Sequence, residues 1–435
     1  MPGEPPTSRS GSTESAPELG LSRRTFIGAM GAGAAALSAG GAISSCAYVH
    51  EPGAPAEGAI TSMIKRGTGE FMLPPDLVYM NNGSLGPTSV SAFDAAMRAW
   101  RDVQSDPVVQ AWGPVLKQAE RALATAADYL ACGVDELAVT RNTTEGMNLV
   151  AQGINLQPGD AVLTTDHEHA GGSLCWRHVQ KYRGVRIDDV TLPVPANDAD
   201  EIMRRFERAI TPQTKVISVS HVTYTTGMKL PITHLAQLAE AHDCLLIVDG
   251  AQGPGAMHVN MRDLRCHAYA TSAHKWLLAP MGTGLLYLRK DVQDRIAPMM
   301  LAQGMRVYTG ASGTRDLPAI VGMGAAIDFM RDKGVERVAQ HAMTLRNDLY
   351  ARCAALPNVE VASPGRSQLA SPLVTLRLPP SVNHAGLARR LHDRHRIVVK
   401  VLSHPALKGI RISSHVYNTA DHVDQLVRAL RAELS

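Results

Sequence analysis

The chain has 435 residues, of which 45% are hydrophobic and 19% are charged. These values are ordinary for a globular protein and leave ample material for more than one domain. The formal net charge of +3 is too small to indicate binding to nucleic acid or to a membrane surface, and there is no arginine-rich stripe with interleaved aromatic residues.

The first part of the chain is not expected to belong to the fold. Residues 1–20 are rich in Pro, Gly, Ser and Glu, a composition typical of disorder. Arg23 and Arg24 then precede a weakly apolar stretch rich in Gly and Ala, and this order resembles a twin-arginine export signal. We therefore expect the twin-arginine translocase to carry the folded protein to the periplasm or the cell envelope.

The end of this signal has two interpretations. Residues 43–46 (ISSC) resemble a lipobox, which would leave Cys46 as a lipidated N-terminus, whereas ordinary cleavage after Ala47 explains the same sequence. We expect residues 1–47 to form the disordered region and the signal, and residues 48–94 to form an N-terminal arm. The apolar stretch is too polar for a permanent membrane span, so membrane contact is expected only through the signal or a lipid anchor.

Residues 95–314 are expected to form a large domain in which strands and helices alternate. Short apolar runs predict strands at 137–140, 161–165, 216–221, 244–249, 268–272 and 284–288. Helical patterns separate them, at 145–153, 200–210 and 232–242. This alternation is typical of βαβ units, so we predict an α/β fold with a mostly parallel sheet.

The pattern changes after this point, and residues 315–435 are expected to form a second, smaller α/β domain. Its elements are predicted as helices at 317–333 and 335–356, a strand at 373–378, a helix near 384–394, strands near 397–401 and 410–413, and a final helix from 419. Five cysteines beyond Cys46 are scattered without a CxxC pair, which argues against a disulfide framework or a zinc site.

Lys275 and Asp249 point most directly to chemistry. Lys275 is flanked by Ala, Trp and Leu, and desolvation by such neighbours disfavours the charged ammonium and exposes a nucleophilic amine. Asp249 ends an apolar strand, at the edge where α/β sheets bind ligands. A lysine amine together with a carboxylate for a ring nitrogen suggests Schiff-base chemistry with pyridoxal 5′-phosphate (PLP).

Seven motifs in chain order carry a resemblance to a known family. They are YMNNGSLG at 79–86, TRNTTEG at 140–146, DHEH at 166–169, VDGAQ at 248–252, TSAHKW at 271–276, GT at 313–314, and RIS at 411–413 with YNT at 417–419. Together they resemble the aminotransferase class V family of fold-type I PLP enzymes, which includes isopenicillin N epimerase-like and cysteine desulfurase-like proteins. The resemblance runs from about residue 75 to the C-terminus, and the epimerase-like branch fits best.

The resemblance implies how the cofactor phosphate is held. Thr143 and Thr144 stand where a strand joins a helix, and the N–H groups and dipole of a helix start favour an anion. A threonine there is also a common N-cap without a ligand. By resemblance, Ser272 and His274 are further phosphate ligands. Thr314 is similar to the residue that reaches the phosphate of a partner subunit, which implies a homodimer.

The resemblance also implies the contacts of the cofactor ring. His169 is similar to the residue that stacks on the ring. Asp249 would pair with the ring nitrogen, and Gln252 would donate to the 3′-oxygen, although an exposed loop glutamine would look the same in sequence. Lys275 would form the Schiff base and then act as acid and base, so Lys275, Asp249 and His169 are the expected catalytic residues.

The substrate contacts are implied at three positions. Arg411 resembles the anchor of a substrate carboxylate, because a planar guanidinium grips a carboxylate with two hydrogen bonds. Asn82 and Tyr224 are expected beside it. His167 shares a face of an extended segment with His169, but a third metal ligand with suitable spacing is lacking, so no metal is expected.

The sequence departs from the desulfurase pattern at two places. Residues 398–407 contain no cysteine where desulfurases carry their nucleophile, and Tyr224 stands where they tend to carry Asn. We therefore expect an enzyme of the epimerase, aminotransferase or lyase type that acts on an amino acid or on a derived peptide or metabolite. The alternatives are a desulfurase-like C–S lyase, which the missing cysteine disfavours, and a PLP-fold protein that binds without catalysis.

Overall fold

The computed structural model describes residues 69–404 and 407–434. The twin-arginine motif, Cys46 and the first part of the predicted arm lie outside the described residues. Among the helices that are described, none is both long and apolar enough to cross a membrane.

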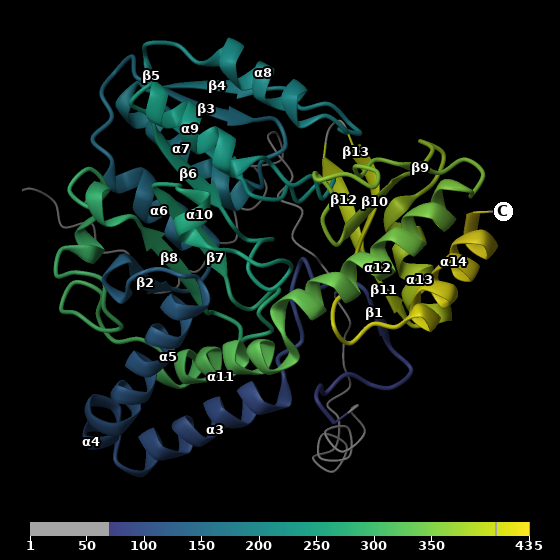
Figure 1. Cartoon of the computed structure of the whole chain (residues 1–435). Helices are drawn as coiled ribbons and strands as arrows, with labels where there is room; N and C mark the ends of the chain where they lie inside the picture. The colour runs from purple at the N-terminus through teal and green to yellow at the C-terminus, as the bar shows by residue number, and fades with distance from the viewer. Residues whose placement is uncertain (1–68, 405–406, 435) are drawn as a thin grey trace, which may run out of the picture. The chain divides into compact units, whose positions relative to one another are not determined.

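A seven-stranded sheet forms the centre of the large domain (Figure 1). In spatial order its strands are β2 (Leu137–Thr140), β8 (Gly284–Leu288), β7 (Ala268–Ser272), β6 (Leu245–Asp249), β5 (Thr214–Ser220), β3 (Ala161–Thr165) and β4 (Arg186–Val190). Only β8 is antiparallel to its neighbours, so the predicted, mostly parallel α/β sheet is confirmed. The edge strand β4 was not predicted, because its sequence RIDDV is mostly polar.

Alternate residues of the strands feed two cores on the two faces of this sheet. In β6, Leu246 and Val248 belong to one core, whereas Leu245 and Ile247 belong to the other, as the period of two in a strand requires. Helices contribute to the first core, namely α3 (Val90–Ser105), α5 (Leu116–Tyr129), α8 (Ala199–Ala209), α9 (Ile232–Ala241) and α11 (Leu317–Lys333). The second core is closed by α6 (Thr143–Gly153) and α7 (Ala170–Arg183).

A four-stranded antiparallel sheet forms the centre of the smaller domain. Its order is β12 (Lys400–His404), β13 (Leu407–Ser413), β10 (Leu373–Arg377) and β9 (Glu360–Val361). Its core is shared with α12 (Val335–Ala354), α13 (His384–His395) and α14 (Ala420–Leu434), which Figure 1 shows beside the sheet. The four helices predicted between residues 315 and 435 are confirmed, α11 among them.

One predicted strand of the smaller domain is divided in the structure. The run near 397–401 forms β11 (Ile397–Val398), which pairs in parallel with β1 (Val78–Tyr79), and the chain then changes partner to continue as β12. The segment after residue 69 therefore lies against the smaller domain. α11, which follows residue 315, packs against α3 and α5 of the large domain.

Short elements complete the described chain. They are α4 (Pro107–Gln110), the π-turn η2 (Ala111–Val115), η3 (Val134–Glu136), α10 (Met261–Leu264), η4 (Lys290–Val292) and η5 (Met299–Leu301). α4 and η2 continue from α3 and expose the apolar side chains of Val108, Val109 and Trp112.

Candidate active site

Asp249 lies at the carboxyl end of β6, where the sheet meets the N-terminus of α7. Its Oδ1 accepts the N–H of Ala251 at 2.9 Å. A Cβ at Gly172 would lie 2.5 Å from Oδ2 of Asp249, so α7 can approach the carboxylate this closely only because residue 172 is glycine. Burial raises the pKa of Asp249, while the Ala251 N–H and the charge of Lys275 act in the opposite direction. A buried carboxylate so placed is suited to a cationic ring nitrogen.

Thr143 and Ser272 meet at the start of α6 although they are 129 residues apart in the chain. The N–H of Thr143 donates to Oγ of Ser272 at 2.9 Å, and the two hydroxyl oxygens lie 2.8 Å apart. Asn142 caps the helix by accepting the N–H of Glu145 at 2.9 Å. The N–H of Thr144 and the hydroxyls of Thr143, Thr144 and Ser272 at this helix start form a donor set that suits a phosphate.

Thr144 and His274 border the same helix start. Thr144 is exposed, and a Cβ at Gly171 would lie 2.4 Å from its Oγ1, so the start of α7 passes close to it. Nδ1 of His274 lies 3.1 Å from the carbonyl oxygen of Thr283. Burial and the neighbouring Lys275 lower the pKa of His274, which favours a neutral imidazole, while the hydrogen bond that Nδ1–H donates to the Thr283 carbonyl opposes the shift.

Lys275 lies in a tightly packed turn after β7. Trp276, Leu277 and Leu278 are fully buried, and Nε1 of Trp276 donates to Oε1 of Gln252 at 2.7 Å. The Lys275 side chain is half-buried and its amine is enclosed, so desolvation lowers its pKa to about 8, against the pull of Asp249 and with a contribution from Arg411. A substantial fraction of neutral amine is therefore present near neutral pH, which a nucleophile or base requires.

His169 caps α7 and keeps one surface open. Its Nδ1 accepts the N–H of Gly171 at 3.0 Å, so the neutral ring carries its proton on Nε2. The ring of Tyr224 stands edge-on to it, with centroids 4.9 Å apart and planes at 89°. Desolvation, followed by the charges of Lys275, Arg411 and Lys400, lowers the pKa of His169 to about 4. A neutral, exposed imidazole is suited to stacking on an aromatic ring.

Arg411 brings the smaller domain into the site. The residue is 2% exposed on β13, and its Nη1 donates to the carbonyl oxygen of Tyr224 at 3.0 Å. Its Nη2 donates to Oγ of Ser84 at 3.0 Å. Ser84 was not assigned a role from sequence, although it stands in the first motif. Its contact shows that the NNGS segment holds the guanidinium in place.

Three predicted residues take part in contacts within the protein. Gln252 donates to the carbonyl oxygen of Gly83 at 2.8 Å as well as accepting from Trp276. Asn82 is fully buried, accepts the hydroxyl of Tyr417 at 2.9 Å and lies 3.4 Å from the Lys275 carbonyl oxygen. Thr314 is exposed before α11 and, among the described residues, has no hydrogen bond to the phosphate cradle. The ligand contacts of these three residues stay predictions.

Glu168 lies in the site, although no role was assigned to it from the sequence. Its carboxylate accepts hydrogen bonds from the hydroxyl of Thr165 at 2.7 Å, and from the hydroxyl and N–H of Ser220 at 2.6 and 3.2 Å. Burial raises its pKa to about 7 although these hydrogen bonds oppose the shift, and the charge of Asp249 raises it further. Ser220 is the register partner of Asp249, so Glu168 lies on the same strand ends as the cofactor residues.

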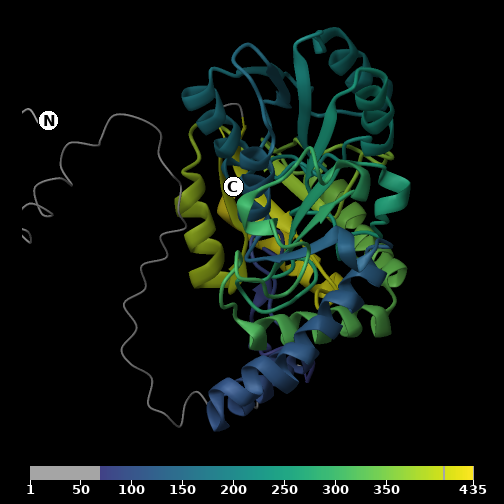
Figure 2. The ribbon, with the colours of Figure 1, turned by 90° about the vertical axis from the view of Figure 1, so that its left-hand side faces the viewer.

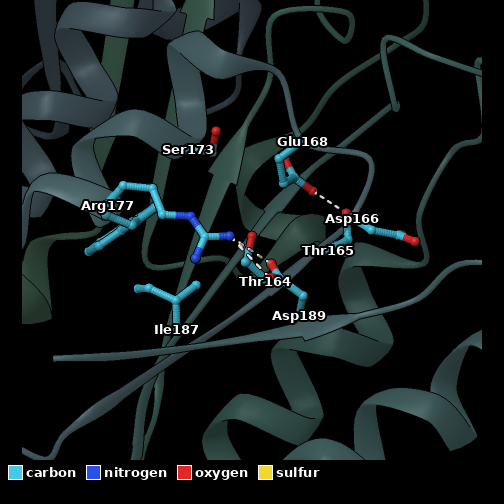
Figure 3. A pocket seen from close by; sticks show the side chains of 9 residues that line it. Thr164, Thr165, Asp166, Glu168, Ser173, Arg177, Ile187 and Asp189 are labelled. Atoms are coloured by element: carbon cyan, nitrogen blue, oxygen red, sulfur yellow. Dashed lines mark hydrogen bonds and ion pairs between the residues drawn. The ribbon is translucent and has the colours of Figure 1, made fainter. Parts of the chain in front are cut away.

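A cavity of about 180 Å³ opens beside Glu168 (Figure 3). An ion pair between Arg177 and Asp189, at 3.1 Å, lines it together with Thr164. The hydroxyl of Thr164 is buried without a hydrogen-bond partner among the described residues. The half-buried Glu168 therefore borders a cavity whose lining includes polar and charged side chains.

These residues fit PLP at three separate points. The start of α6 supplies the donors for a phosphate, Asp249 supplies a buried carboxylate, and Lys275 supplies an amine with a lowered pKa. A glycine at 172 lets α7 and His169 approach from the side of the sheet. Fold and site together define a PLP-dependent enzyme of fold type I.

The chain belongs to the aminotransferase class V family. The model of that family, described as aminotransferase class-V, matches residues 110–426. The isopenicillin N epimerase of Amycolatopsis lactamdurans is 33% identical over 390 residues, which cover 84% of this chain and 97% of that protein. The isopenicillin N epimerase of Streptomyces clavuligerus is 30% identical and covers 84% of this chain and 96% of that protein.

Solved structures confirm the fold. The cystine C–S lyase C-DES, in complex with its reaction product cysteine persulfide, aligns with a TM-score of 0.75. The alignment covers 82% of this chain and 98% of that one, at 22% sequence identity. The likeness establishes the two-domain fold and leaves the reaction to be argued from the residues.

Proposed function

We propose that this protein is an epimerase-type enzyme that moves the α-proton of an amino acid, or of a peptide or metabolite derived from one. The observation that carries the proposal is the joint position of Lys275, Asp249 and Arg411 around one site. The two epimerase relatives, aligned over most of the chain, support it.

The residues divide the work of proton transfer. When bound, PLP withdraws electrons from the Cα of an amine joined to it and so acidifies the α-proton. Asp249 holds the proton on the ring nitrogen, and Arg411 fixes the substrate carboxylate and with it the direction of the Cα–H bond. The Lys275 amine, with its pKa lowered to about 8, takes that proton on its own face.

Epimerisation needs a second proton carrier on the opposite face of Cα. Tyr224 is our candidate, because its ring packs against His169 and its backbone carbonyl holds Arg411. Burial raises the pKa of Tyr224, Arg411 opposes the shift and Glu168 adds to it, so the phenol keeps its proton at neutral pH. A protonated hydroxyl on the His169 side can return a proton that Lys275 removed from the other side.

Persulfide chemistry of the desulfurase type lacks a nucleophile. A cysteine acts as a thiolate, and residues 398–407 contain no cysteine. Burial raises the pKa of Cys132, Cys175, Cys266 and Cys353 to about 12, so these thiols stay protonated. A desulfurase-like activity is therefore the weaker alternative.

Deuterium exchange tests the reaction. In D₂O the holoenzyme is expected to interconvert the enantiomers of its substrate and to place deuterium at Cα. Tyr224→Phe is expected to keep exchange of one enantiomer through Lys275 but to lose interconversion. Release of a keto acid as the main product would mean that the enzyme is a transaminase or a lyase and not an epimerase. Absence of a cofactor band in the purified protein would favour the non-catalytic binding protein.

We also propose that the protein is exported through the twin-arginine route. The support is the Arg-Arg pair before a weakly apolar stretch and the compatibility of that route with an enzyme that binds its cofactor before export. Replacing Arg23 and Arg24 by lysine should leave the precursor inside the cell. Mass spectrometry of the secreted N-terminus decides between a lipidated Cys46 and cleavage after Ala47. Unchanged secretion of the double variant would exclude this route.

We further propose a homodimer. Trp100, Val108, Val109 and Trp112 are exposed on the helices α3, α4 and η2, which are dark blue at the lower edge of Figure 2. Clustered exposed aromatic and aliphatic side chains are typical of protein interfaces. Light scattering is expected to give twice the chain mass for the wild type and the single chain mass for Trp100→Glu with Trp112→Glu. A monomeric wild type would remove the proposed role of Thr314.

A further inference from the structure

The carboxylate of Glu168 reaches the strand end next to the one that carries Asp249. Its Oε2 accepts the hydroxyl of Ser220 at 2.6 Å, and its Oε1 accepts the N–H of the same residue at 3.2 Å. Ser220 ends β5 and is the register partner of Asp249, which ends the adjacent parallel strand β6. Neighbouring strands lie about 4.8 Å apart, so Glu168 and Asp249 bring two carboxylates to adjacent strand ends.

The cavity beside Glu168 gives this pair of carboxylates a route for proton exchange. Thr164 lines the cavity, is 4% exposed, and has a hydroxyl without a hydrogen-bond partner among the described residues. A polar cavity of about 180 Å³ has room for several water molecules and offers them partners (Figure 3). Glu168 can therefore lose a proton to water although Asp249 is only 6% exposed.

The two carboxylates repel each other until a cation arrives. Burial raises the pKa of Glu168 to about 7 and the charge of Asp249 adds to this shift, while hydrogen bonds from Ser220 and Thr165 oppose it. A positive charge on a ring nitrogen at Asp249 would offset the repulsion and favour the ionised form of Glu168. Binding of a cationic ring and ionisation of Glu168 therefore assist each other.

We infer that Glu168 is a positioning residue for the cofactor, which forms with Asp249 a pair of carboxylates that stabilises a positive ring nitrogen and which releases its proton into the cavity when the ring binds. Asp249 is the expected contact of that nitrogen, and Glu168 acts through Asp249. Water takes up the released proton, and the carboxylate that remains offsets the charge that the ring brings. Because it concerns the charge of the ring and not the bond broken in the substrate, this role is independent of the proposed epimerase reaction.

Four titratable side chains near the pair of carboxylates stay uncharged near neutral pH. Burial lowers the pKa values of His167 and His169, that of His169 to about 4. Burial also raises the pKa values of Tyr224 and Cys175. These four groups therefore do not change their charge while Glu168 titrates.

The charged neighbours require a comparison in which they cancel. Asp166 and the ion pair between Arg177 and Asp189 line the cavity and are present with every cofactor. Lys275, whose pKa burial lowers to about 8, titrates close to Glu168. It takes part in the binding of any pyridoxal compound, so its titration cancels when two such compounds are compared.

A cofactor analogue without the ring nitrogen isolates the role of Glu168. In 1-deazapyridoxal 5′-phosphate a C–H group replaces that nitrogen, so the aldehyde and the phosphate are kept and the ring charge is lost. Reconstitution of the full-length chain gives dissociation constants for PLP and for the analogue. Near pH 8.5, Glu168→Gln should weaken PLP binding about threefold to tenfold and leave the analogue within about twofold. Near pH 5.5, where the wild-type carboxyl is mostly protonated, the PLP effect should also fall within about twofold.

Two variants are controls for this comparison. Glu168→Asp keeps a carboxylate and should keep the preference for PLP near pH 8.5. Glu207→Gln removes an exposed carboxylate of α8 and should change neither constant.

Proton release by the wild type is a second measurement, which decides the question even if Glu168→Gln does not fold. Calorimetry in buffers of different ionisation enthalpy counts the protons released on binding. Near pH 7, binding of PLP, corrected for the protonation of its free ring, should release about half a proton more than binding of the analogue.

The outcomes separate an effect of charge from an effect of structure. Equal weakening of PLP and the analogue in Glu168→Gln, or a loss of PLP affinity of the same size at both pH values, would mean that Glu168 acts only through its hydrogen bonds to Ser220 and Thr165. Either result would overturn the inference, as would unchanged constants or equal proton release with both compounds. None of these results bears on the epimerase, which deuterium exchange tests separately.

Discussion

The two halves of the active site are built in different ways. In the large domain, Asp249 and Ser272 end buried parallel strands, and their polar atoms are held by neighbouring backbone and side-chain groups. In the smaller domain, Arg411 and Lys400 leave the surface of an antiparallel sheet as long cationic side chains. The ends of the parallel strands set the positions of the first group of side chains. The positions of the second group depend on how the smaller sheet packs against the large domain.

This difference separates the two binding tasks. The large domain alone supplies the phosphate cradle, the carboxylate and the lysine, so it defines the cofactor position. The smaller domain adds cations through contacts such as that from Arg411 to Ser84. Substitutions in the smaller domain should therefore change substrate binding and leave cofactor binding intact. Substitutions in the phosphate cradle of the large domain should weaken cofactor binding and leave the substrate affinity of the fully loaded enzyme intact.

The largest effect is expected for Lys275→Ala. Loss of the amine removes both the covalent link to the cofactor and the proton carrier, so turnover should fall at least about 10³-fold. The absorbance band of lysine-bound cofactor should be lost in the same variant. Lys215→Ala removes an exposed lysine of β5 and should leave both measurements unchanged. A normal band in Lys275→Ala would place the Schiff base on another residue.

Arg411→Lys should damage the other half of the site alone. The charge remains, but the planar pair of donors is lost, so KM is expected to rise about tenfold to a hundredfold. The spectrum and the affinity for PLP should stay those of the wild type. Arg377→Lys is the matched control, because Arg377 on the adjacent strand β10 pairs with Glu360 at 2.8 Å. Loss of PLP from Arg411→Lys would mean that the smaller domain also contributes to cofactor binding.

The same division marks what the sequence could predict. Residues of the cofactor half lie next to strong local signals, such as the apolar run that ends at Asp249, and the strands there were predicted nearly to the residue. Their side chains point to the ligand because the ends of parallel strands all meet at one edge. Sequence order alone therefore brings Asp249 and Lys275 together.

The substrate half depends on pairings between strands, which no local signal reveals. That Lys400 faces the site follows only from its register with Arg411, and the predicted strand near 397–401 did not show that the chain changes partner there. Glu168 was missed for a similar reason. Its neighbour His169 matched a motif, but its own partner Ser220 is 52 residues away.

Glu168→Gln tests whether a titrating group lies beside the cofactor half. A carboxyl whose pKa is raised from 4.5 to about 7 binds more protons in the folded chain than in the unfolded one between these values. It therefore stabilises the fold at low pH, and this contribution is lost as pH rises through about 7. Because Glu168 lines a cavity and is only half-buried, we expect a change of about 1 to 3 kcal/mol across this window.

The comparison between variant and wild type isolates this contribution. Buried histidines such as His221 and His415, whose pKa values burial lowers from 6.5 to about 3 and about 4, have the opposite slope in an overlapping pH range. Subtracting the wild-type free energy of unfolding from that of Glu168→Gln at each pH removes them. This difference in the free energy of unfolding, variant minus wild type, should increase between pH 5 and pH 8. A difference independent of pH would mean that Glu168 does not titrate there.

The smallest effect is expected for Thr143→Val, which removes one hydroxyl from the phosphate cradle. The N–H that donates to Ser272 remains, so the helix start should keep its shape. Affinity for PLP should fall about threefold to tenfold, as for one hydrogen bond. Thr344→Val, which removes a hydroxyl bonded only within α12, is the control. This variant also tests whether the two halves of the site bind independently. The substrate dissociation constant of the Thr143→Val enzyme, measured with PLP at saturation, should equal that of the wild type. An equal loss of substrate affinity would show that the phosphate cradle also sets the position of the smaller domain, and the two halves would then have to be treated as one site.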